Sequence, residues 1–153
     1  MRSWNSSSPR SVPPARPTLA DQRPVVLDTD AASLIIKGRG DTLAAQLAGR
    51  TWCVSYVTVG ELVKWGNTQR WGLRRWTTLA DWLGRVVVLP YSIEVAYTWG
   101  QLAAAAQLRG RPRPANDMWV ASCCLAENTS LATRNVKDYA DFAEHHGLRL
   151  ALD

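Results

Sequence analysis

From Pro24 onward, short apolar runs alternate with longer helical stretches, and this alternation limits the possible folds more than any other feature. The runs at 25–27 and 86–89 are continuously apolar, as strands buried on both faces would be. Further strands are expected at 52–56, at 130–133 and, as an edge strand, at 148–150. Helices are expected at 31–37, 41–48, 58–65, 71–83, 92–108, 117–127 and 136–145. The pattern predicts an α/β fold with a mainly parallel sheet of four to five strands.

The first 23 residues differ in composition from the rest. They are rich in Pro, Ser and Arg, with almost no aliphatic residues, so they cannot bury enough apolar surface to offset the entropy of ordering. We therefore expect a disordered tail at 1–23 and a single domain at 24–153. The formal net charge of the chain is +5, which makes a polyanionic partner plausible. Because most of this excess lies in the tail, a site in the domain must be identified from individual residues.

The remaining composition bears on the cellular compartment and on the role of the tryptophans. The three cysteines show no metal-ligand spacing and are expected to be small buried apolar residues, as is usual inside cells. No apolar run approaches the roughly 20 residues that cross a bilayer, and no secretory signal is recognisable, so we expect a cytoplasmic protein without a membrane partner. Trp65, Trp71, Trp76 and Trp82 cluster in the middle helices, which favours a core or subunit contact over base stacking.

Four acidic residues are expected at one edge of the sheet. Asp28 ends the first strand, Glu61 lies in the helix after the second strand, Asp117 begins the helix near 117–127, and Asp138 follows the fourth strand. Ligands of open α/β sheets bind outside the carboxyl ends of the strands. Clustered carboxylates repel one another unless a cation compensates them. The pattern therefore indicates a Mg²⁺ or Mn²⁺ site.

Each acid also has a purely structural interpretation. The spacing of Thr58 and Glu61 is that of a helix capping box, and Asn135 and Asp138 have the same spacing. Asp117, in a first helical turn, suits the helix dipole without any chemical role. For a single acid we favour the structural interpretation, whereas four acids at one edge favour a metal site.

The chemistry that suits such a site is hydrolysis of phosphodiester bonds. A bound metal ion lowers the pKa of a water molecule and stabilises the leaving oxygen, and a neighbouring carboxylate orients or deprotonates the water. Arg113, in the arginine-rich loop before Asp117, is a candidate substrate-binding residue because its guanidinium precedes the acidic site by only a few positions. The alternative for this loop is simply a solvated surface.

Four segments together resemble the PIN-domain ribonucleases. They are VVLDTDAAS, SYVTVGEL, LRGRPRPANDMWVAS and LATRNVKDY, which occur in the order and at the spacing of that family. Within it, the chain most resembles the VapC-type toxins of bacterial toxin–antitoxin pairs. The resemblance covers about residues 25–150, which is nearly the whole expected domain.

This resemblance implies a three-layer α/β/α sandwich that cleaves RNA with Mg²⁺ or Mn²⁺. The family's acidic site corresponds here to Asp28, Glu61 and Asp117, and the resemblance implies that Asp28 and Asp117 are the direct metal ligands. Asp138 corresponds to a fourth member that acts through water. Thr29, Thr133 and Asn135 correspond to groups that position the phosphate. Asp30 stands where the family has Asn or a small polar residue, and it adds charge to the site or caps the next helix. The implied partners are an RNA substrate, a VapB-like antitoxin and a second copy of the chain in a homodimer.

Three alternatives compete with a PIN-type nuclease. Asp28-Thr29-Asp30 resembles the first motif of haloacid-dehalogenase phosphatases, but Ala32 stands where that motif has Thr or Val. A phospho-receiver domain needs an acceptor Asp after a central strand, and the run at 86–89 ends in Pro90. The third alternative is a PIN fold kept for RNA binding without nuclease activity, although every expected acid is present.

Overall fold

Four short strands form one fully parallel sheet. The computed structural model describes residues 10–14, 19 and 23–152. The strands are β1 (Pro24–Leu27), β2 (Thr51–Ser55), β3 (Val87–Leu89) and β4 (Ser130–Ala132). Their order in the sheet is β3-β2-β1-β4, and every pairing is parallel. The strand that follows β3 in the sequence therefore lies at the opposite edge of the sheet, beside β1.

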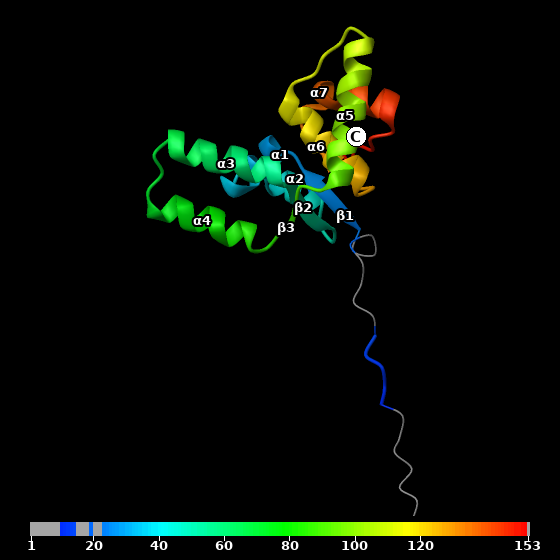
Figure 1. The fold of residues 1–153 in the computed structure, drawn as a ribbon. Coiled ribbons are helices and arrows are strands. Elements are labelled where there is room, and N and C mark those ends of the chain that lie inside the picture. The colour runs from blue at the N-terminus through cyan, green and yellow to red at the C-terminus, as the bar shows by residue number, and fades with distance from the viewer. Residues whose placement is uncertain (1–9, 15–18, 20–22, 153) are drawn as a thin grey trace, which may run out of the picture.

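In the described part of the chain, seven helices connect and flank the strands (Figure 1). They are α1 (Thr29–Ile36), α2 (Asp41–Gln46), α3 (Tyr56–Thr68), α4 (Leu73–Leu83), α5 (Ile93–Leu108), α6 (Ala115–Ala126) and α7 (Val136–His146). Helices α3 and α4 form a hairpin that projects from one side of the molecule in Figure 1, whereas α5, α6 and α7 group together on the other side. The secondary structure thus follows the predicted alternation of strands and helices.

The two faces of the sheet contribute to two separate apolar cores. Along β1, Val26 faces one core together with residues of α5, α6 and α7, including Leu102, Val120 and Phe142. Its neighbours Val25 and Leu27 face the other core, which is built from residues of α1, α2, α3 and α4. This alternation is the expected two-residue period of a strand. The result is the predicted α/β/α sandwich with a parallel sheet of four strands among the described residues.

Two details of the predicted sheet were wrong. The run at 86–89 was expected to be a buried strand, but Val87 and Val88 are exposed, because β3 is an edge strand that pairs only with β2. The segment 148–150 was expected to be an edge strand, but it forms only one isolated parallel bridge, between Leu131 and Leu150. Apolar runs of three or four residues do not distinguish a central strand from an edge strand.

The predicted tail falls largely outside the described residues. Residues 10–14 are described, and they are exposed and have no helix or strand. Leu19 is partly buried and packs against the core that contains Val26. Regular structure among the described residues begins at Pro24, and the domain boundary at 23–24 stays a prediction.

Candidate active site

The strand order creates a crevice at the carboxyl ends of β1 and β4. The chain moves from β1 outward to β2 and β3, then returns to the other side of β1 as β4. Helices on opposite faces therefore diverge between β1 and β4, and ligands of parallel α/β sheets bind at such a reversal. In register, Leu27 of β1 pairs with Ala132 of β4, so the residues that follow them, Asp28 and Thr133, lie next to each other.

Asp28 is the buried centre of this crevice. Its side chain caps α1, with Oδ1 accepting a hydrogen bond from the backbone N–H of Ala31 at 2.9 Å. Oδ2 accepts a hydrogen bond from the hydroxyl of Thr133 at 2.5 Å. Asp28 is only 3% exposed, and its burial raises its pKa from 3.8 to about 6, helped by the charges of Asp30 and Asp117. Two hydrogen bonds thus hold a carboxylate that its surroundings do not favour in the charged form.

Glu61 reaches the same crevice from α3. The capping-box interpretation of Thr58 and Glu61 was wrong, because α3 begins earlier and its cap is Ser55, whose Oγ accepts from the N–H of Thr58 at 3.2 Å. Glu61 therefore lies in the second turn, where Oε1 accepts a hydrogen bond from the Thr29 hydroxyl at 3.0 Å. The Thr29 hydroxyl is also 3.1 Å from Oγ1 of Thr58. The position of Glu61 is set by contact with α1 rather than by capping.

Asp117 approaches from the first turn of α6, on the opposite side of the sheet from α3. Its Oδ1 accepts a long hydrogen bond from the buried hydroxyl of Tyr139, at 3.4 Å. Burial raises the pKa of Asp117, and the charges of Asp138, Glu61 and Asp30 raise it further. Asp117 thus lies in a first helical turn, as the sequence suggested, but burial and the neighbouring acids disfavour its charged form.

The loop after β4 completes the crevice. The Thr133 hydroxyl accepts a hydrogen bond from the backbone N–H of Asn135 at 3.0 Å, and the Asn135 side-chain amide donates to Asp30. The capping-box interpretation of Asn135 was also wrong, since its side chain makes no cap to α7. Asp138 lies exposed in the first turn of α7. The Asn135 bond ties the β4 loop to α1 across the crevice.

These side chains line one small polar pocket, which we call the acidic pocket. Its lining residues are Asp28, Thr29, Asp30, Glu61, Asp117, Val120, Asn135, Asp138 and Tyr139. All four predicted acids line the pocket, together with the predicted Thr29 and Asn135. Thr133 does not line it, but its hydroxyl donates a hydrogen bond to Asp28, which does. The ion pairs of the described residues all involve other acids, so no described cation neutralises this pocket.

The acidic pocket suits a hard divalent cation. Its donors are carboxylate, hydroxyl and amide oxygens, and its acids raise one another's pKa in the absence of a compensating charge. No three His, Cys, Asp or Glu side chains among the described residues form a ready-made metal cluster. A hard divalent cation that keeps several water molecules needs only one or two carboxylates from the protein. Asp28 and Asp117 are the buried and half-buried acids on facing elements that fit this role.

Arg113 lies apart from the acidic pocket. Its guanidinium is 4.0 Å from the buried carboxylate of Asp141, which Arg109 also contacts at 2.6 Å. Burial alone would raise the pKa of Asp141, but Arg109, Arg113 and His145 together hold it below its ordinary value. The arginine-rich loop before Asp117, which was predicted to meet the substrate, is thus bound to α7 through Asp141. The sequence pattern did not single out this acid.

Two polar residues of the pocket were missed or only partly anticipated. Tyr139 was not predicted, because a tyrosine next to Phe142 in an amphipathic helix looks like an ordinary core residue. Its position immediately after Asp138 was the available signal. Asp30 was considered either as an added charge or as a helix cap. The structure brings it to the pocket, where Asn135 contacts it, and the cap of α1 is Asp28 instead.

The fold and the pocket together define a class of parallel α/β protein with a carboxylate-lined site at the reversal of strand order. A model of the family described as "PIN domain" matches residues 25–145, which is most of the chain. The chain belongs to the PIN-domain family. This membership also decides against the haloacid-dehalogenase and phospho-receiver alternatives.

Curated relatives within the family are similar along most of their length. The chain is 27% identical over 117 residues to Ribonuclease VapC2 of Haemophilus influenzae, covering 74% of this chain and 88% of that protein. It is 29% identical over 121 residues to Ribonuclease VapC1 of another Haemophilus influenzae strain, with the same coverage.

Solved structures support the fold. The VapBC-1 structure from nontypeable Haemophilus influenzae aligns with a TM-score of 0.74 at 24% identity, covering 83% of this chain and 96% of that chain. The Rickettsia felis VapBC2 structure, bound to a DNA fragment from its promoter, aligns with a TM-score of 0.73 at 23% identity and the same coverage. Both describe toxin–antitoxin complexes.

Proposed function

We propose that this chain is a metal-dependent endoribonuclease and the toxin of a toxin–antitoxin pair. The observation that carries the proposal is the meeting of Asp28, Glu61, Asp117 and Asp138 in one pocket that no described cation neutralises. Family membership and the relatives named ribonuclease VapC support the same activity. The substrate is RNA, and the bond hydrolysed is a phosphodiester.

The metal is Mg²⁺ or Mn²⁺, held directly by Asp28 and Asp117. When bound, it supplies Lewis-acid stabilisation of the scissile phosphate and a more acidic water molecule. Thr133 and Ala31 fix the orientation of Asp28, and Tyr139 contacts Asp117. Glu61 and Asp138 would orient or deprotonate the attacking water, and Thr29 and Asn135 would position the phosphate beside them. Asp30 adds a further negative charge at the mouth of the pocket.

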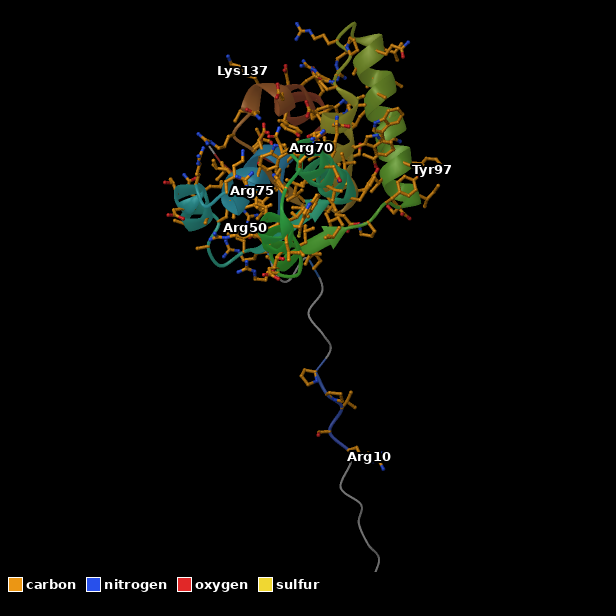
Figure 2. The ribbon with its side chains drawn as sticks, turned by 90° about the vertical axis from the view of Figure 1, so that its left-hand side faces the viewer. Arg10, Arg50, Arg70, Arg75, Tyr97 and Lys137 are labelled. Atoms are coloured by element: carbon orange, nitrogen blue, oxygen red, sulfur yellow. The ribbon has the colours of Figure 1, made fainter. Side chains whose placement is uncertain are left out.

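The proposed partners are a VapB-like antitoxin and a second copy of this chain. The solved relatives are complexes with antitoxins, which supports the first partner. The second is supported by exposed apolar side chains in β3, in the segment after it and at the start of α5, namely Val88, Tyr91, Ile93 and Tyr97. Tyr97 is 71% exposed and points away from the body of the molecule (Figure 2).

The proposed compartment is the cytoplasm, where RNA is found. Among the described residues, no helix is long and apolar enough to cross a bilayer. The three cysteines, Cys53, Cys123 and Cys124, are all buried and free of disulfides, as the composition suggested.

The activity is tested by incubating purified protein with labelled single-stranded RNA in Mg²⁺ or Mn²⁺, with and without EDTA. We expect cleavage that EDTA abolishes. Asp28→Asn and Asp117→Asn should each reduce the cleavage rate by about 100-fold or more, since each removes a carboxylate charge that would hold the metal ion. Asp138→Asn should lower the cleavage rate about tenfold, because the exposed Asp138 would act through water rather than hold the ion directly.

Glu94→Gln is the matched control, since Glu94 is exposed in α5 and lies outside the pocket. It should cleave like the wild type. Equal cleavage by the wild type and both Asp variants would reveal a contaminating nuclease and exclude the proposal. Binding of intact RNA without cleavage in either metal would instead identify the catalytically silent RNA-binding form of the PIN fold.

A further inference from the structure

Two larger cavities continue from the acidic pocket over the surface of α1, α3 and α4. The first, a groove of about 590 Å³, shares Thr29, Asp30 and Glu61 with the acidic pocket. The second has a volume of about 550 Å³ and shares Lys37 and Trp65 with the groove. Three cavities therefore follow one another from the predicted metal ligands to the α3–α4 hairpin.

The cavity at the far end, which we call the basic pocket, is lined by cations and apolar groups but by no acid. Its lining residues are Ile36, Lys37, Arg39, Trp65, Trp71, Arg74, Arg75 and Thr78. Within the described part of the chain, none of its four cationic side chains forms an ion pair with a carboxylate. The Lys37 ammonium lies over the ring of Trp65, 4.3 Å from its centroid.

This concentration of charge is not a general property of the domain. Residues 24–153 are close to neutral overall. The acidic pocket, which carries the opposite charge, lies at the other end of the groove. Cations gathered in a concave site and left without counter-charges raise the local concentration of polyanions. The hairpin that carries Arg74 and Arg75 faces the viewer in Figure 2, where Arg70 and Arg75 are labelled.

We propose that the basic pocket binds the RNA strand that flanks the scissile phosphate, with its backbone phosphates held by Lys37, Arg39, Arg74 and Arg75. The proposal rests on the proposed ribonuclease activity. RNA is a continuous polymer, so a strand whose phosphate occupies the acidic pocket must continue over the adjoining surface. The groove is that surface. A strand that follows the groove away from the acidic pocket reaches the basic pocket, whose cations form no ion pair with a described carboxylate.

The binding test uses fluorescence anisotropy of a labelled 12-nucleotide single-stranded RNA in Mg²⁺, in an Asp117→Asn background that blocks cleavage. The test variant is Arg74→Gln with Arg75→Gln. The matched control is Arg85→Gln with Arg149→Gln, which removes two exposed arginines that line none of these cavities. Thermal melting of every variant verifies that the fold is intact.

The test variant should bind the RNA about tenfold more weakly than its parent and should reduce the slope of log affinity against log salt by about 1.4, which is about 0.7 for each lost phosphate contact on a single strand. The control should stay within about twofold of the parent. Equal affinities of test and control variants would overturn the proposal. If the test variant loses affinity for poly-L-glutamate but keeps its affinity for RNA, the basic pocket belongs to an acidic polypeptide, which also overturns it.

Cleavage by proteins with Asp117 intact separates this proposal from the activity itself. A wild-type protein that binds but does not cleave the 12-nucleotide RNA contradicts the nuclease function alone, because the binding comparison still decides the role of the basic pocket. If the wild type cleaves, Arg74→Gln with Arg75→Gln should lower kcat/KM for the 12-nucleotide RNA about tenfold. It should leave cleavage of a 4-nucleotide RNA within twofold, because so short a strand gains little from a distant site.

Discussion

At the scale of single residues, Asp28 combines two requirements that oppose each other. It must be buried to be held by Thr133 and by the N–H of Ala31, but burial raises its pKa to about 6. A carboxyl group whose pKa is higher in the folded state than in the unfolded state favours folding only while it is protonated. This contribution is complete below the ordinary pKa of 3.8 and is lost as the pH rises through about 6. Above that pH, a bound divalent cation would compensate the unfavourable burial of the charged Asp28 carboxylate.

Asp28→Asn should therefore stabilise the metal-free protein at pH 7.5. The amide keeps an oxygen that accepts from Ala31 and removes the buried charge. The gain is at most about 3 kcal/mol, at 1.36 kcal/mol for each pKa unit between 3.8 and about 6. Urea denaturation in EDTA at pH 7.5 and pH 4 measures the free energy of unfolding of the variant and the wild type. The difference between the two proteins should be much smaller at pH 4. A variant that is no more stable than the wild type at pH 7.5 would contradict the raised pKa.

At the scale of elements, the α3–α4 hairpin depends on a close contact at one glycine. The rings of three tryptophans pack edge to face. The ring centroids of Trp65 and Trp71 are 4.8 Å apart, and those of Trp71 and Trp76 are 5.3 Å apart. They lie against Gly66, where a Cβ atom would come within 2.5 Å of the Trp76 ring and 2.8 Å of the Trp71 ring. The three tryptophans are partly buried and pack against the core, whereas a subunit contact, the other role expected of them, stays a prediction. The same hairpin carries Arg74 and Arg75 of the basic pocket.

Gly66→Ala should lower the free energy of unfolding by about 1–2 kcal/mol. Overpacking against two indole rings costs about 1–3 kcal/mol, and the higher helix propensity of alanine returns part of this. Gly60→Ala, in the same helix, is the control, because nothing lies within 4 Å of a Cβ at that position. It should be neutral or stabilising by up to about 1 kcal/mol in the same chemical denaturation experiment. Equal effects of both substitutions would show that the indole contacts impose no packing constraint.

At the scale of the whole molecule, the return of the chain from β3 to β4 has two consequences. It leaves β3 at an exposed edge, and it brings α6 and α7 to the same crevice as α1 and α3. The crevice becomes the acidic pocket, whereas the exposed edge strand is followed in the chain by the exposed apolar side chains of Tyr91, Ile93 and Tyr97. The candidate active site and the proposed dimer face are thus products of one topology.

Tyr97→Arg, combined with Ile93→Arg, should convert the proposed dimer to a monomer. Two charged groups in an apolar contact would have to lose their hydration without a partner, which opposes association. Size-exclusion chromatography with light scattering measures the mass directly. The control is Leu108→Arg, at the far end of α5, where Leu108 is 87% exposed. A monomeric wild type, or a double variant that remains dimeric, would contradict the assignment of this face.

Much of the fold and most of the acidic pocket could be predicted from the sequence. Alternating apolar runs and helical stretches encode a parallel sheet, because each pattern reflects which side chains are buried locally. Since parallel strands present their carboxyl ends at one edge, acids such as Asp28 and Asp117 could be expected to meet there. The capping alternatives for Glu61 and Asn135 show the limit of this approach, because a three-residue spacing does not reveal where a helix begins.

The tertiary structure alone decided which groups pair across elements. Arg113 stands four residues before Asp117 in the sequence, but its guanidinium lies near Asp141 of α7. Tyr139 reaches Asp117 only because α6 and α7 pack side by side, and Val88 is exposed only because β3 has one neighbour. Local patterns determine periodicity and strand ends, whereas ion pairs, hydrogen bonds and exposure depend on distances between segments far apart in the chain. The sequence by itself determined the class of fold and the acids at its edge, and the packing of helices decided how they are held and what surrounds them.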